Sequence, residues 1–166
     1  MTVPESVVNL LKPWNEFYSH SKGAATIVIF LHVGGILLAG GLAIAADRST
    51  LRAMRIAAGD RSHYMRELGA VHRWVISGLT IVVLSGLLLL TADIETFFGS
   101  WIYWTKMALV VVLLINGLMM TRSEAALERD ASATSPHWNS LHRHAVFSLG
   151  LWFAITAFGV ALANFS

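Results

Sequence analysis

The sequence contains no cysteine and few charged residues. Without thiols the chain cannot form disulfides, thiolate metal sites or cysteine-held iron–sulfur clusters, so any metal or cofactor must be held by His, Met, Lys, carboxylate or backbone groups. Charged residues make up only 13% of the 166 residues, whereas 55% are hydrophobic. This composition disfavours a water-soluble domain and indicates a lipid bilayer as the first partner.

Other absences narrow the function further. The N-terminus lacks a charged start followed by an apolar run and a small-residue cleavage site, so we expect no removable signal peptide. There is no phosphate loop, nucleophile motif or HExxH pattern, which disfavours hydrolytic chemistry. The basic residues stand beside apolar runs rather than forming a stripe with interleaved aromatics, so nucleic acid is not an expected partner.

Four apolar runs, each about 20 residues long, match the length needed to cross a bilayer as a helix. They cover residues 24–46, 74–92, 101–120 and 145–163. Because backbone polar groups cannot stay unpaired in hydrocarbon and no alternating strand pattern is present, we expect helices, with short connections making neighbours antiparallel. The sequence therefore predicts an all-α integral membrane protein, an antiparallel four-helix bundle in a single domain over residues 1–166.

Residues 4–19 mix apolar and aromatic side chains with polar ones before the first run. This pattern predicts a short amphipathic helix lying at the membrane interface, with Pro13 as a candidate break.

Nine of the 12 Lys and Arg residues fall in the two segments 47–73 and 121–143. The positive-inside rule then places these two connections in the cytoplasm and both termini outside. We expect a multi-pass protein of a bacterial inner (plasma) membrane.

Two ionisable residues lie well inside the apolar runs: His32 in the first and Lys106 in the third. Such groups are costly in a membrane, so each needs a partner or a function. His32 is either hydrogen-bonded to a neighbouring helix or a ligand of haem iron or another metal. Lys106 either extends to the outer headgroups or faces inward and pairs with an anion such as a haem propionate near His32.

Small residues follow His32 at helical spacing, beginning with Gly35 and Ala39. They predict a groove almost free of side chains. Two interpretations are open: close packing with a neighbouring helix, which could also serve dimerisation, or a flat cofactor bound against this face.

Three further histidines mark the cytoplasmic side, where His72 opens the second run and His142 and His144 precede the fourth. Two histidines on facing diagonal helices can hold a haem iron from both sides. His142 and His144 lie on opposite faces of a helix, and we expect His142 to point inward with His72. Interfacial histidines near lipid phosphates are the alternative.

The motifs "FLHVGGILLAGGLAIAADR", "MRELGAVHRWVISGLTIVVLSGLLLL" and "WIYWTKMALVVVLLINGLMM" resemble the HemJ-type protoporphyrinogen oxidase family. The first-span His with small residues is also similar to CopD-type proteins, and the extra histidines are similar in style to cytochrome b561-like proteins. The HemJ resemblance implies a small membrane bundle that binds haem b, with His32 as an axial ligand and Trp101 and Lys106 contributing to activity.

The sequence thus predicts a membrane haem b protein, with one haem or two, acting in electron transfer or in oxidoreduction of a porphyrin or quinone type substrate. Copper handling is the first alternative, with His32, the cytoplasmic histidines and the soft ligands Met107, Met119 and Met120 as stepping sites. The second is a cofactor-free subunit or assembly factor of a membrane complex. A membrane protein partner or a homo-oligomer is compatible with all three.

Overall fold

The computed structural model describes residues 3–53, 61–129 and 137–165, without the side chains of residues 53, 61–70, 72 and 128. Every element in these ranges is a helix, which confirms the predicted all-α class. In chain order the helices are α1 (Glu5–His20), α2 (Lys22–Ala53), α3 (Arg61–Ala92), α4 (Ile94–Gly99), α5 (Trp101–Arg129) and α6 (His137–Phe165).

Four of these helices are long and apolar enough to cross a membrane. The candidate spans are Lys22–Arg52, Arg73–Ala92, Trp101–Leu127 and His137–Phe165. Each contains one of the apolar runs seen in the sequence. Large apolar side chains such as Phe30, Leu37 and Phe153 are exposed on the outside of the bundle, where hydrocarbon rather than water would be their solvent. The fold is that of a membrane helical bundle.

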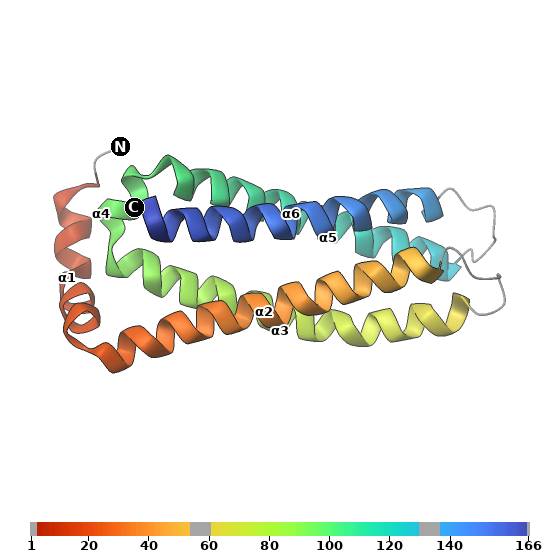
Figure 1. The fold of residues 1–166 in the computed structure, drawn as a ribbon, viewed down its shortest axis with the longest axis horizontal. Coiled ribbons are helices and arrows are strands. Elements are labelled where there is room, and N and C mark those ends of the chain that lie inside the picture. The colour runs from red at the N-terminus through yellow and green to blue at the C-terminus, as the bar shows by residue number, and fades with distance from the viewer. Residues whose placement is uncertain (1–2, 54–60, 130–136, 166) are drawn as a thin grey trace.

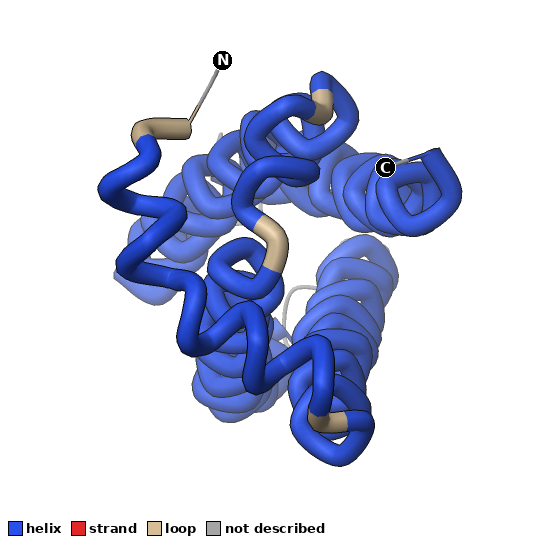
Figure 2. Tube along the Cα trace, turned by 90° about the vertical axis from the view of Figure 1, so that its left-hand side faces the viewer, coloured by secondary structure: helices blue, strands red, loops and turns tan. Residues whose placement is uncertain are grey.

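The long helices run antiparallel as two hairpins, α2 with α3 and α5 with α6 (Figure 1). The hairpins meet mainly where α2 packs on α6, whereas α3 and α5 touch over a short stretch. Both chain termini and α4 lie at one end of the bundle (Figure 1). Seen from that end, α1 crosses over the helix ends (Figure 2). This arrangement leaves α3 and α5 as loosely joined neighbours.

The helix α1 matches the predicted interfacial helix in position, and it buries none of its residues. Two of its polar side chains bond to the end of α3: Trp14 Nε1 donates to the Leu88 carbonyl at 3.0 Å, and Asn15 Nδ2 donates to the Ala92 carbonyl. Pro13 lies inside the helix rather than breaking it. Proline removes only one backbone donor, and the helix continues to His20.

The α2–α3 contact is the closest in the bundle because glycine and alanine face each other there. A Cβ added to Gly35 would lie 2.9 Å from the Val82 side chain, and one added to Gly78 would lie 2.9 Å from Ala39 Cβ. Small residues let helix backbones approach closely, which maximises packing contacts where no hydrophobic effect drives helix association.

The buried core has two parts. One lies at mid-bundle and is formed by Ala39, Leu113, Leu151, Trp152 and Ile155. The other lies nearer the arginine-rich end and is formed by Met120, Leu127, Trp138, Leu141 and Ala145. Both join the α5–α6 hairpin tightly, and Ala39 ties α2 to it.

Candidate functional site

His32 lies between α2 and α3 and is half-buried. Its Nδ1 is 3.2 Å from the Val82 carbonyl oxygen and 3.1 Å from Ser85 Oγ, both on α3. Gly86 makes room for the ring, since a Cβ there would lie 3.2 Å from the imidazole. On α3, Ser85 therefore provides a hydrogen-bond acceptor for this histidine, and Gly86 provides space for its ring.

These contacts fix the ring tautomer. A carbonyl oxygen can only accept, so Nδ1 carries the proton and donates it to Val82. Ser85 Oγ is 2.6 Å from the Ile81 carbonyl and donates there, leaving its lone pairs to accept from Nδ1 as well. Nε2 then holds an unprotonated lone pair, and it makes no hydrogen bond within the described part of the chain. This is the state in which histidine binds a metal ion.

Lys106 on α5 turns inward rather than extending to the headgroups. Its Nζ lies against α6, 3.7 Å from the position of a Cβ on Gly159. The two ionisable residues found in the sequence are thus brought into the same half of the bundle.

Trp101 is not part of this group. Its side chain is 70% exposed and contacts the ring of Phe158 edge-on, with 6.4 Å between the ring centroids. This position on the outer surface is typical of an aromatic residue at a membrane interface.

Gly35 and Ala39 lie in the tight α2–α3 interface described above, where α3 fills the groove. Of the two interpretations of this face, the structure shows close helix packing. A flat cofactor has no space between these two residues and α3.

The histidines on α6 at the arginine-rich end of the bundle are arranged differently from the prediction. His142 is exposed, whereas His144 is half-buried against α5. His144 Nδ1 lies 2.8 Å from Asn116 Oδ1, and Asn116 Nδ2 donates to the His144 backbone carbonyl at 3.0 Å. The expectation that His142 points inward is wrong, because the buried face of α6 runs through Leu141, Ala145 and Ser148. The side chain of His72 lies outside the described residues.

The methionines considered for copper do not gather around His32. Met107 and Met119 are exposed on α5, and Met120 is buried in the core near the other end. Over the described ranges, no group of three or more His, Asp or Glu side chains converges as a metal site would require.

Sequence reasoning missed Asp47, which directly follows the first apolar run. Because α2 continues to Ala53, Asp47 lies inside the bundle, where it is 2% exposed. Among the residues that the structure describes, its Oδ2 has no hydrogen-bond partner, and neither has Thr50 Oγ1 one turn further on. A signal was present in the sequence: residues 39, 43 and 47 share one helix face at four-residue spacing.

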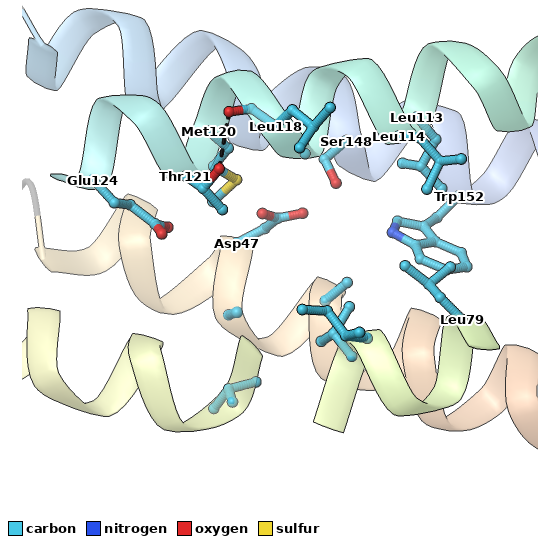
Figure 3. A pocket seen from close by; sticks show the side chains of 16 residues that line it. Asp47, Leu79, Leu113, Leu114, Leu118, Met120, Thr121, Glu124, Ser148 and Trp152 are labelled. Carbon is cyan, nitrogen blue, oxygen red and sulfur yellow. Dashed lines mark hydrogen bonds between the residues drawn. The ribbon is translucent and has the colours of Figure 1, made fainter. Parts of the chain in front are cut away.

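Asp47 borders a cavity of about 400 Å³ to which all four long helices contribute (Figure 3). The walls are mainly aliphatic. The Ser148 hydroxyl on α6 points toward the Asp47 carboxyl, and the indole of Trp152 stands at the opposite end. His32 is not among the lining residues, so this cavity and the His32 site are separate.

The fold and these two sites define a membrane helical bundle with one histidine hydrogen-bonded between two helices and one mainly aliphatic cavity bordered by a buried carboxyl. The chain matches no protein-family model, no curated protein and no solved structure. The family resemblance given by the motifs therefore stays a prediction.

Proposed function

We propose that this protein binds haem b within the membrane through His32 and acts in electron transfer or in oxidoreduction of a porphyrin or quinone type substrate. The observation that carries the proposal is the pair of hydrogen bonds at His32 Nδ1. They orient the ring and leave the Nε2 lone pair free. Iron-ligating histidines characteristically donate their other N–H to a carbonyl or carboxylate in this way.

The donor set near His32 fits haem b. With no cysteine in the chain, histidine is the strongest iron ligand that it offers,. Lys106 supplies a positive charge on the same half of the bundle, suited to the anionic propionates. Bound haem b would supply one-electron redox chemistry. The protein's own contribution would be to hold the ring, balance its charge and exclude water.

The proposal is for one haem rather than two. A second haem between His72 and His142 has little support, since His142 is exposed. His144 is engaged with Asn116 at the α5–α6 contact. The roles of Trp101 and Lys106 in activity remain part of the proposal, with Lys106 favoured because it is turned toward the bundle interior.

Absorption spectra of the purified protein test this proposal. Wild-type protein supplied with haem should show a Soret band and, after dithionite reduction, sharp α and β bands. The variant His32→Ala should lose these bands, and the matched controls H142A and H144A should keep them. Wild-type protein that stays colourless with haem supplied, or an unchanged His32→Ala spectrum, would refute the assignment.

We also propose a bacterial inner membrane location with both termini outside. Arg48, Arg52, Arg122, Arg129 and Arg143 lie toward the end of the bundle opposite the termini, which the positive-inside rule assigns to the cytoplasm. Because the chain has no cysteine, single introduced cysteines can show on which side of the membrane each end of the bundle lies. A membrane-impermeant maleimide should label Ser19→Cys in intact spheroplasts and Asn139→Cys only after lysis. The reverse pattern would show the opposite orientation.

A further inference from the structure

The cavity beside Asp47 has the size and the opening of a ligand site. Its volume of about 400 Å³ is well above the ~150 Å³ that holds benzene and within the range of small-molecule sites. It is bordered by Ile76 on α3 and by Leu114 and Leu118 on α5, whose side chains are also exposed on the outside of the bundle. A molecule dissolved in the bilayer can therefore enter between α3 and α5, which have the smallest contact of the neighbouring long helices.

One end of the cavity presents an unused hydrogen-bond acceptor. Asp47 is buried, and its Oδ2 has no hydrogen-bond partner in the described part of the chain. An unsatisfied buried polar atom costs about 1–3 kcal/mol, and a ligand that donates to it would remove this cost. Whether the carboxyl is ionised or neutral, it retains an oxygen that can accept.

The opposite end presents an unused donor. Figure 3 shows the indole nitrogen of Trp152 turned into the cavity, toward Asp47. Indole N–H can only donate, and it has no hydrogen-bond acceptor among the described residues. The six-membered ring of Trp152 packs on Gly40, 3.0 Å from the position of a Cβ there, which holds the indole in place.

The cavity also favours some ligands over others. Its described lining residues include Asp47 and Glu124 but no Lys, Arg or His, a set that favours an uncharged ligand over fatty acids and other lipid anions. The remaining surface is almost entirely aliphatic, which favours an uncharged molecule with a hydroxyl donor on one side and an oxygen acceptor on the other.

We propose that this cavity binds a lipid-soluble hydroquinone, with one hydroxyl donating to Asp47 and the opposite oxygen accepting from Trp152. The tail would leave between α3 and α5. As a binding site it stands independently of haem. Its role as the substrate site rests on the proposed function above.

Calorimetric titration of the full chain in lipid nanodiscs tests the proposal, with empty nanodiscs as the blank. The probes are a para-hydroquinone with a short alkyl tail and its dimethyl ether, which has the same ring but no O–H donor. Wild-type protein should bind the hydroquinone about tenfold or more tighter than the ether. Asp47→Leu should reduce hydroquinone binding to the level of the ether.

A second variant keeps the test valid if Asp47→Leu fails to fold. Gly117 borders the cavity, and a Cβ there would meet nothing within 4 Å. Gly117→Leu should fill the cavity and abolish binding. Gly41→Leu is the matched control, because a Cβ on Gly41 also has no atom within 4 Å and Gly41 does not border the cavity. This variant should bind the hydroquinone as wild type does.

Equal binding of the two probes by wild-type protein would overturn the proposal, as would undiminished binding by Gly117→Leu. The variant His32→Ala separates this inference from the haem proposal. It should bind the hydroquinone as wild type does even when it has lost its haem spectrum. A wild-type protein that binds hydroquinone but no haem would refute the proposed function and leave the cavity assignment standing.

Discussion

The two sides of α3 are built differently. Toward α2, glycines bring the backbones together, and the polar group at this contact, His32, has partners on the other helix. Toward α5 there is a cavity, and the polar group that borders it, Asp47, keeps one oxygen unpaired. In hydrocarbon a satisfied polar group contributes to structure, whereas an unsatisfied one persists at a cost. The α2–α3 side is therefore packed to hold the fold, whereas the α3–α5 side has the space in which we propose a ligand.

The largest expected effect comes from placing the same side chain on each side. Gly78→Leu would collide with the backbone and Cβ of Ala39, so we expect a loss of about 3 kcal/mol in the free energy of unfolding. Gly117→Leu enters open space and should be neutral or stabilising. Unfolding in mixed micelles, followed by circular dichroism, measures both. Equal destabilisation by the two variants would remove the contrast between the two sides.

Next in size is the effect of removing the unpaired carboxyl. Asp47→Leu should raise the free energy of unfolding by about 2 kcal/mol, because it replaces an unsatisfied buried group with an apolar one of similar volume. The control is Asp93, whose side chain accepts from Thr96 N at the start of α4. Asp93→Ala should instead lower stability by about 1 kcal/mol. Destabilisation by Asp47→Leu would show that Asp47 is a structural residue.

A smaller effect is expected from Ser85. Ser85→Ala removes one of the two acceptors of His32 Nδ1 and leaves the Val82 carbonyl. We expect a loss of about 1 kcal/mol in stability, with haem retained and its bands slightly shifted. Thr80→Ala is a control on the same helix, because Thr80 bonds only to the Ile76 carbonyl of its own helix. A complete loss of haem in Ser85→Ala would mean that Ser85 is more than a positioning residue.

The smallest effect concerns an interhelical pair of α5 and α6, Asn116 and His144. A double-mutant cycle with Asn116→Ala and His144→Ala should give a coupling energy of about 0.6 kcal/mol, typical of hydrogen bonds between membrane helices. Haem content should not change in either variant. Loss of haem in His144→Ala would indicate that a haem ligand lies at this end of the bundle.

The fold could largely be predicted from the sequence. The four apolar runs are long enough to span a bilayer, and a helix pairs all backbone polar groups within such a run. The short helix α4 was missed, since six residues capped by Asp93 carry no periodic signal. His32 and Lys106 were found because an ionisable group inside an apolar run is conspicuous. Asp47 was not, because it directly follows the run, and hydropathy does not show that α2 continues to Ala53.

The orientation of side chains around a helix was the least predictable feature. The choice between His142 and His144 depended on which face of α6 meets α5, and that is set by contacts such as Asn116 that no local pattern reveals. For the same reason the small face at Gly35 and Ala39 could be interpreted as a cofactor groove until α3 was seen to fill it.

The most direct test of the central claim, that His32 holds a haem in the membrane, is the haem-to-protein ratio of the purified wild-type chain by the pyridine haemochrome assay. The account predicts one haem b per chain, and none in His32→Ala. A ratio of zero with haem supplied, a ratio of two, or haem retained by His32→Ala would contradict it.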